Sequence, residues 1–397
     1  MDATYTDTTS STLTLRQRFQ RDRKLRSSLI IGVITFIFTT AICIPVITSF
    51  DEGVLAFAHI GTFFSEGEPN GSIGYDGQFA YFIARDGAEA VPFIDGPTLR
   101  YQRILYPVLA RALALGSADL VPWTLLGINI VAHSVGAALL AYILAGFGAP
   151  PAGALIFTFW IGNLFGVRFN LNEPLCFALA IAAIVAYQKD RYRLTIILLM
   201  LSTIAKELGL VIAAGLALHA FWNRRWGWSI LIFGGPLLLF LTWWGVMRLW
   251  FGTLPTIYPA AKIHFIPFEG LFSLVNDHPR LADRDPATLQ LEFGLLLFFM
   301  GIPTLLFLLA AVWRFIQRRD LLLAASLVIP AAGFVMTMPD VSWHDQVAAY
   351  RVGAPIVITG ILFTGYFHKR KLKWLAAYWI PAALLIFLIP GLWSGGA

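Results

Sequence analysis

Long apolar runs alternate with short polar segments along most of the chain. The longer runs have about 20 residues, which lets a helix cross the roughly 30 Å hydrocarbon core of a bilayer. Lipid offers no partner to a free peptide group, so such spans must be helices. The pattern predicts an all-α polytopic membrane protein of about eleven transmembrane helices, over residues 29–50, 123–146, 151–167, 171–187, 193–205, 207–222, 228–250, 293–316, 320–338, 347–367 and 374–393.

The segment between residues 193 and 222 has two interpretations. It is either one long tilted helix or two short helices that meet at the outer membrane surface. Lys206 and Glu207 lie near its centre, and a charged pair in the middle of a membrane would be expensive. We therefore predict two helices.

The composition supports embedding of the whole chain. Of its 397 residues, 58% are hydrophobic and 13% are charged, whereas a soluble protein carries about 25% charged residues. We expect residues 29–397 to form a single transmembrane domain and residues 1–28 to form a basic cytoplasmic tail. The first apolar run exceeds the roughly 7–15 residues of a signal-peptide core, so we take it as a retained span.

The net charge of +6 comes from short basic clusters between apolar runs, which indicates topology rather than nucleic-acid binding. With a cytoplasmic N-terminus and the split at 206–207, every cluster faces the cytoplasm: Arg16–Arg26, Lys189–Arg193, Arg224–Arg225, Arg314–Arg319 and His368–Lys373. Because long loops often carry binding and catalytic residues, we expect function on the outer face, which receives residues 51–122, 168–172, 251–292 and 339–346.

The first outer loop contains the main catalytic candidate, Asp76. This residue begins a segment in which Tyr75, Phe79, Phe82 and Ile83 share one helical stripe. The stripe predicts an amphipathic helix that lies on the bilayer surface, with outer loop 51–122 around it. Asp76 either caps this helix or acts as a general base beside a lipid-borne substrate.

Two further carboxylates are catalytic candidates. Asp86 lies on the same stripe and is either a second candidate base or the salt-bridge partner of a nearby arginine. Asp51, followed by Glu52, leaves the first span and is either a third candidate or an ordinary hydrophilic end of that span.

Several outer polar residues are candidates for substrate binding. Arg100 and Arg103 are three positions apart and share one face of a helical turn, and paired guanidiniums suit phosphate oxygens. Contact with anionic lipid headgroups is the alternative. Each of the five remaining candidates has a structural alternative. For Glu173 it is a carboxylate at a helix start, and for Lys206 and Glu207 it is an ion pair. For His344 it is a solvated loop residue, and for Arg351 it is a charge with a partner inside a span.

Metal and nucleotide motifs are missing from the sequence. The two cysteines, Cys43 and Cys176, lie in apolar runs, and the seven histidines show no HxxxH or HExxH spacing. The sequence also lacks a P-loop and a GxSxG elbow. We expect no metal site, although a requirement for a divalent cation stays open.

Three short stretches resemble one family. Tyr75-Asp76-Gly77-Gln78-Phe79 with Ile83-Ala84, followed by Tyr101-Gln102-Arg103-Ile104-Leu105-Tyr106-Pro107, is similar to bacterial members of the GT-C class of polyprenyl-phosphate-sugar-dependent glycosyltransferases. The first stretch also resembles the W-D-x-x-x-(F/Y)-x-x-I-A loop of GPI-anchor mannosyltransferases, with Tyr75 in place of Trp. Ala205-Lys206-Glu207-Leu208-Gly209-Leu210 is similar to an A-K-E-T-G-L stretch of several members.

The resemblance implies a role for each matching residue. Asp76 would be the base, the motif marks Tyr75 and Gln78 as substrate contacts, and the donor phosphate would be held by Arg100, Arg103, Lys206 and Arg351. Asp51-Glu52 also resembles the D-E at the first-span exit of the protein-mannosylating and aminoarabinose-transferring branches, so the identity of the base stays open.

The resemblance also implies a reaction and a location. A single sugar would pass from a polyprenyl phosphate to a glycan, lipid or protein acceptor at the outer face of the inner membrane, with no nucleic acid involved. A transporter or flippase of a lipid-linked or anionic substrate is an alternative, as is a non-catalytic assembly subunit.

Overall fold

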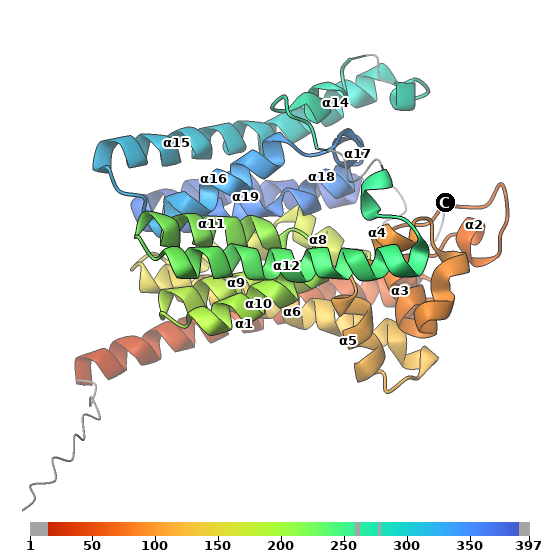
Figure 1. Ribbon diagram of the computed structural model, residues 1–397, viewed down its shortest axis with the longest axis horizontal. Coiled ribbons are helices and arrows are strands. Elements are labelled where there is room, and N and C mark those ends of the chain that lie inside the picture. The colour runs from red at the N-terminus through yellow and green to blue at the C-terminus, as the bar shows by residue number, and fades with distance from the viewer. Residues whose placement is uncertain (1–14, 259–262, 277–278, 389–397) are drawn as a thin grey trace, which may run out of the picture.

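The computed structural model describes residues 15–258, 263–276 and 279–388, and every regular element within these ranges is a helix (Figure 1). The longest helices lie side by side in one bundle. The elements that build it are α1 (Leu15–Ser49), α6 (Val121–Gly146), α9 (Glu173–Gln188), α10 (Tyr192–Ala205), α11 (Gly209–Trp222), α12 (Trp226–Phe251), α15 (Ile302–Arg318), α16 (Leu323–Met336), α19 (Ala354–Phe367) and α20 (Leu372–Trp379). The prediction of an all-α chain is confirmed for the described residues.

Fewer helices are long and apolar enough to be candidate membrane spans than the sequence pattern predicts. Four helical segments of the described chain are long and apolar enough to cross a membrane: Asp22–Ser49, Ala118–Gly146, Trp226–Phe251 and Pro286–Arg318. A fifth arises if Gln346–Val352 and Ala354–Phe367 count as one bent span. Helices such as the 16-residue α9 are apolar but only about 24 Å long. The helices are compatible with a membrane protein, but the eleven spans are not confirmed.

The outer surface of the bundle is apolar. Leu29 of α1, Leu238 of α12 and Leu306 of α15 are 64%, 68% and 60% exposed. A surface helix of a soluble protein places polar residues on this side. The apolar exterior is what lipid contact requires.

The break within 193–222 occurs where the sequence predicts it. Helix α10 ends at Ala205 and α11 begins at Gly209, so Lys206 and Glu207 lie between two helices rather than inside one. The prediction of two helices is confirmed. Their junction brings two charged side chains to an end of the bundle.

The predicted span 151–167 is wrong as a single helix. It consists of a 3-10 turn (Pro151–Ala154), α7 (Leu155–Thr158) and α8 (Ile161–Arg168). Trp160 is extended between α7 and α8, and its indole nitrogen donates to the carbonyl of Tyr350 at 3.0 Å. The chain is therefore interrupted at Trp160, and hydropathy alone carries no sign of this break.

The predicted span 347–367 is bent. Helix α18 (Gln346–Val352) meets α19 at Gly353 with an angle of 41°. Pro355 lies in the first turn of α19, which begins at Ala354, and it cannot donate a backbone hydrogen bond, so the helix restarts there. The last predicted span, 374–393, is α20 followed by a 3-10 segment (Ile380–Leu388), and residues 389–393 lie outside the described residues.

The first long loop folds into a small helical cap. Its elements are η1 (Gly53–Phe57), α2 (Thr62–Ser65), α3 (Gly77–Asp86), η2 (Gly87–Phe93), α4 (Pro97–Tyr101), α5 (Leu105–Leu113) and η3 (Ala118–Leu120). Residues 77–84 of α3 are all buried, because η2 and α5 pack over them. The prediction that this helix lies on the bilayer surface is therefore wrong. Helix α5 instead exposes apolar residues, including Val108 and Leu113.

The second long loop lies at the same end of the bundle as this cap (Figure 1). Within its described residues it contains η5 (Pro255–Ile257), α13 (Glu269–Phe272), η7 (Pro279–Leu281) and the start of α14 (Pro286–Leu296), and α13 packs on α17 (Asp340–His344). We call the part of the bundle that carries α3, α4, α17 and the 206–207 junction the loop end.

Basic residues gather at the opposite end of the bundle. The junction of α9 and α10 meets that of α11 and α12 there, where Arg225 forms an ion pair with Asp190 at 2.9 Å. Arg314 of α15 contacts His368, just after α19, at 3.2 Å. The long helices therefore separate these basic clusters from the loop end.

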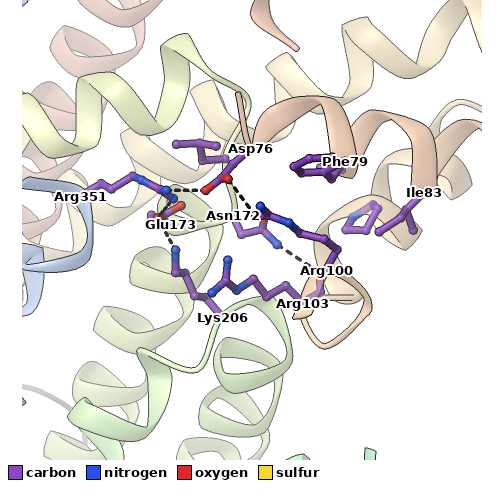
Figure 2. Close-up of a pocket in the computed structure, with 12 residues that line it drawn as sticks. Asp76, Phe79, Ile83, Arg100, Arg103, Asn172, Glu173, Lys206 and Arg351 are labelled. Carbon is purple, nitrogen blue, oxygen red and sulfur yellow. Dashed lines mark hydrogen bonds and ion pairs between the residues drawn. The ribbon is translucent and has the colours of Figure 1, made fainter. Parts of the chain in front are cut away.

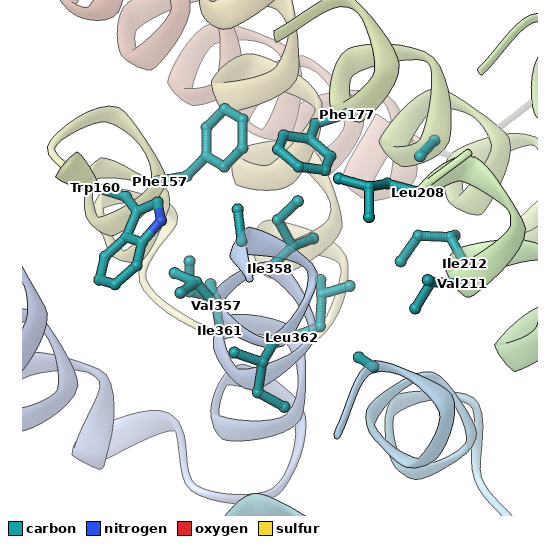
Figure 3. Close-up of a cluster of buried hydrophobic side chains, with 14 of the residues drawn as sticks. Phe157, Trp160, Phe177, Leu208, Val211, Ile212, Val357, Ile358, Ile361 and Leu362 are labelled. Carbon is teal, nitrogen blue, oxygen red and sulfur yellow. The ribbon is translucent and has the colours of Figure 1, made fainter. Parts of the chain in front are cut away.

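Helix α19 forms the centre of the apolar core (Figure 3). Val357, Ile358, Ile361 and Leu362 are almost completely buried. Around them lie the aromatic side chains of the α7–α9 region and the apolar side of α11, including Phe157, Trp160, Phe177, Leu208, Val211 and Ile212. This packing fixes the position of Arg351, which α18 presents at the loop end.

Candidate functional site

A charged cavity lies at the loop end of the bundle (Figure 2). The free space between its lining side chains is about 350 Å³ when the open solvent at the mouth is counted, and about 20 Å³ of it admits the centre of a water-sized sphere. Segments distant in sequence contribute its lining: Asp76, Phe79, Ala80, Ile83, Arg100, Arg103, Pro107, Leu171, Asn172, Glu173, Lys206 and Arg351. Six of the residues selected from the sequence therefore meet in one place.

Asp76 lies between two arginines. It precedes α3 but makes no side-chain cap bond, so the N-cap interpretation is wrong. Its Oδ1 accepts a hydrogen bond from Arg100 Nη1 at 2.8 Å, and its Oδ2 accepts one from Arg351 Nη2. Both carboxylate oxygens are thus occupied by guanidinium groups.

Glu173 occupies the first position of α9 and is completely buried. A carboxylate is favoured there by the helix dipole. One of its oxygens, Oε1, accepts from Lys206 Nζ and, at 2.7 Å, from Arg351 Nη1. Arg351 therefore bridges Glu173 and Asp76 with its two terminal nitrogens.

Arg103 and Glu207 form a bidentate pair at the edge of the cavity. Arg103 donates from Nε at 3.0 Å and from Nη2 at 2.7 Å to the two carboxylate oxygens. Asn172 supports this edge, because its Nδ2 donates to the carbonyls of Arg103 and Ala205, each at 3.1 Å. The sequence suggests an ion pair between Lys206 and Glu207, but the two adjacent residues bind different partners.

Arg100 has a second carboxylate partner. It donates to Asp95 from Nε at 2.8 Å and from Nη2 at 2.7 Å, while its guanidinium lies 4.2 Å from the centroid of the Phe79 ring. Removing Asp76 would therefore leave Arg100 paired.

Tyr75 fixes the loop that carries Asp76. Its hydroxyl donates to Asp345 at 2.6 Å, and Arg351 lies 5.5 Å from its ring centroid. Asp345 in turn accepts from the backbone N–H of Val347 at the start of α18. Tyr75 thus joins the Asp76 loop to the helix that carries Arg351.

The electrostatics keep Asp76 ionised. Burial raises its pKa, but the guanidiniums of Arg100 and Arg351 lower it by more, so the pKa lies well below the usual range of an aspartate. An aspartate in this state accepts a proton poorly. Its affinity for a proton would rise only with weaker arginine contacts.

The cavity lining carries four cations and two carboxylates. The cations are Arg100, Arg103, Lys206 and Arg351, and the carboxylates are Asp76 and Glu173. Two buried polar atoms at the site, Glu173 Oε2 and Arg351 Nε, have no hydrogen-bond partner within the described protein. Buried polar atoms normally find a partner, so the site suits a donor such as water or a hydroxyl group at Glu173 Oε2 and an acceptor at Arg351 Nε.

Four sequence candidates lie elsewhere. Asp86 forms a bidentate pair with its neighbour Arg85 at 2.7 and 2.6 Å, as its structural alternative predicts. Asp51 is exposed in the turn after α1. His344 Nε2 contacts Ser273 Oγ at 2.7 Å. Gln78 accepts from the N–H of residue 61 and donates to the carbonyl of residue 73, which holds the loop fold.

Four residues that the structure places around the site have no site role assigned from the sequence. Asn172 and Phe79 line it, and Asp95 and Asp345 bind the residues that line it. Asp95 lies only five positions before Arg100, so its closeness in sequence is a signal that it pairs with that arginine. The partner of Tyr75 is 270 positions away, and no local pattern indicates it.

Comparisons of the chain with protein-family models, with curated proteins and with solved structures found no significant match. Any functional assignment therefore rests on the residues themselves. Among the described residues, no group of three or more His, Cys, Asp or Glu side chains could hold a metal ion.

Gly77 controls how closely the Asp76 loop approaches the bundle. A methyl group there would lie 1.9 Å from the carbonyl oxygen of Phe169 and 3.2 Å from that of Ala58. We expect Gly77→Ala to push α3 away and to lower the free energy of unfolding by about 1–3 kcal/mol. Thermal denaturation of the purified protein in detergent measures this loss.

Gly127→Ala is the matched control for this change. A methyl group at Gly127 in α6 meets open space, so we expect unchanged or slightly raised stability, by up to about 1 kcal/mol. Equal stability of the Gly77→Ala variant and the wild type would contradict the tight packing of α3.

Proposed function

We propose that the chain is a membrane glycosyltransferase that moves a single sugar from a polyprenyl-phosphate donor to an acceptor on the outer face. The observation that carries this proposal is the position of one carboxylate, Asp76, among four cations in a single cavity. A lipid-phosphate sugar needs cations for its phosphate, and an acceptor hydroxyl needs a base. The apolar exterior and the resemblance of residues 75–79 to GT-C enzymes support the same proposal.

The proposed reaction uses the cavity residues in separate roles. The acceptor hydroxyl oxygen attacks the anomeric carbon, and the bond from this carbon to the phosphate oxygen breaks. The polyprenyl phosphate leaves with the bonding electron pair, stabilised by Arg103, Lys206 and Arg351. The hydroxyl proton passes to Asp76.

Donor binding would also prepare the base. Phosphate oxygens compete with the carboxylate of Asp76 for the guanidiniums of Arg100 and Arg351. Once these contacts are shared, the pKa of Asp76 rises towards its ordinary value and the carboxylate can accept a proton. The ion pairs of Asp76 thus suit a base that becomes active only beside a donor phosphate.

The test measures cleavage of polyprenyl-phosphate hexoses by the protein in proteoliposomes, with water or an added glycoside as the acceptor hydroxyl and release of polyprenyl phosphate as the readout. We expect cleavage by the wild type and a rate at least 100-fold lower in Arg351→Lys. The single ammonium of a lysine does not replace a planar guanidinium whose two terminal nitrogens each bind a carboxylate. Arg225→Lys, an exposed pair at the opposite end, is the control and should retain activity. Full activity of Arg351→Lys would contradict the assigned role.

A transporter or flippase is the second candidate. Glu173, Lys206 and Arg351 are buried together at the end of the bundle, and buried charges of this kind also occur in transport pathways. Translocation of a labelled lipid-linked sugar without release of polyprenyl phosphate in the same proteoliposomes would favour it over the transferase.

A further inference from the structure

An apolar groove follows the outside of the bundle between α15, α19 and α20. It shares no residue with the charged cavity. Its lining consists of Phe298, Ile302, Pro303, Leu306, Phe307, Ala310, Phe363, Thr364, His368, Lys371, Trp374, Leu375 and Tyr378. The groove therefore combines an almost wholly apolar wall with two basic side chains.

The two basic side chains lie at one end of the groove. His368 and Lys371 follow α19 at the basic end of the bundle. At the other end, the hydroxyl of Tyr378 donates to the carbonyl of Phe298 and closes the floor. Phe298 and Ala310 are twelve positions apart, which is about 18 Å of helix. This length is close to the roughly 15 Å of hydrocarbon in one leaflet.

The walls of the groove are open to the surroundings. Ile302 and Trp374 are 43% and 68% exposed, and Leu306 continues the same surface. Covering this exposed apolar area with a hydrocarbon chain, or surrounding it with lipid, lowers the free energy of the system. The shape favours one extended chain over a compact ligand.

The mouth of the groove is cationic. Arg314 Nη2 contacts His368 Nε2 at 3.2 Å, and Lys371 is exposed beside them. Burial lowers the pKa of His368, and the charges of Arg314 and Lys371 lower it further. The ring is therefore a neutral acceptor for Arg314. Neither Arg314 nor Lys371 forms an ion pair with a carboxylate within the described residues.

We propose that this groove binds one acyl chain of an anionic phospholipid, with the headgroup phosphate on Arg314 and Lys371. Charge complementarity decides the ligand, because two cations without carboxylate partners stand at the open end of a hydrocarbon-lined channel. A basic surface alone would attract anionic headgroups, but it would offer no site for the acyl chain. The proposal depends on the membrane embedding of the chain and not on the transfer reaction.

The first test blocks the groove without changing its charge. Ala310→Trp places an indole in the channel, whereas Leu309→Trp places one on the neighbouring exposed position outside the lining. Native mass spectrometry of the purified protein measures retained phosphatidylglycerol against phosphatidylcholine. We expect at least tenfold preference for phosphatidylglycerol in the wild type and in Leu309→Trp, and loss of the bound lipid in Ala310→Trp.

The second test reverses the charge of the mouth. Arg314→Glu with Lys371→Glu should abolish the preference for phosphatidylglycerol. Arg318→Glu with Arg370→Glu makes the same change in net charge at exposed positions outside the lining and should retain it. This pair of variants also decides the matter if Ala310→Trp fails to fold. Equal retention of both lipids by the wild type, unchanged binding in the Arg314/Lys371 variant, or preference for free polyprenyl phosphate would overturn the proposal.

Discussion

Asp76→Asn is expected to reduce release of polyprenyl phosphate by about 10²–10⁴-fold, because an amide cannot accept the proton of the acceptor hydroxyl. The fold should survive this change. Arg100 keeps its bidentate partner Asp95, and Arg351 keeps Glu173. The measurement is the initial rate of cleavage in proteoliposomes, together with the thermal stability of the variant.

Asp86→Asn is the matched control, because Asp86 ends the same helix that Asp76 precedes. It is paired with Arg85 outside the cavity, so we expect activity close to that of the wild type. Full activity in Asp76→Asn would exclude it as the base. Loss of activity in Asp86→Asn with retention in Asp76→Asn would exchange the roles of the two carboxylates.

Glu173→Gln is expected to be the most destabilising single change at the site, with a loss of about 3–5 kcal/mol. Glu173 Oε1 serves both Lys206 and Arg351, and all three side chains are buried. Neutralising Glu173 leaves buried positive charge without compensation. Thermal denaturation followed by size-exclusion chromatography measures the effect.

A second substitution tests whether the cost is electrostatic. Glu173→Gln combined with Lys206→Met removes the uncompensated ammonium, so the double variant should be more stable than Glu173→Gln alone. Asp190→Asn breaks an exposed ion pair with Arg225 and should cost less than about 1 kcal/mol. Simple additivity of the two buried changes would show that Glu173 and Lys206 are not coupled.

The sequence predicts those parts of the site that depend on local signals. Charged residues within an apolar run force a helix break, which is why the ends of α10 and α11 could be placed at Lys206 and Glu207. A carboxylate before Pro174 indicates a helix start, and α9 begins at Glu173. Both features follow from the cost of burying charge and from helix geometry, which adjacent residues determine.

The choice of partners could not be predicted in the same way. Asp76 and Asp86 belong to the same short segment, and only the covering of α3 by η2 and α5 directs one carboxylate to the cavity and the other to Arg85. Trp160, at the break between α7 and α8, likewise donates to a carbonyl 190 positions away. Hydropathy indicates which residues avoid lipid, but it does not indicate which of them meet.

The network around Glu173 also has a consequence for the order in which the chain is made. Its lysine partner follows only 33 positions later, whereas Arg351 follows after 178. At about 5–20 residues per second, roughly 10–40 s separate the synthesis of Glu173 from that of its second partner. Lys206 is thus the early counterion that lets α9, α10 and α11 assemble. Asp76 meets Arg100 after only 24 positions but waits 275 positions for Arg351, so the cavity is complete only when the C-terminal helices arrive.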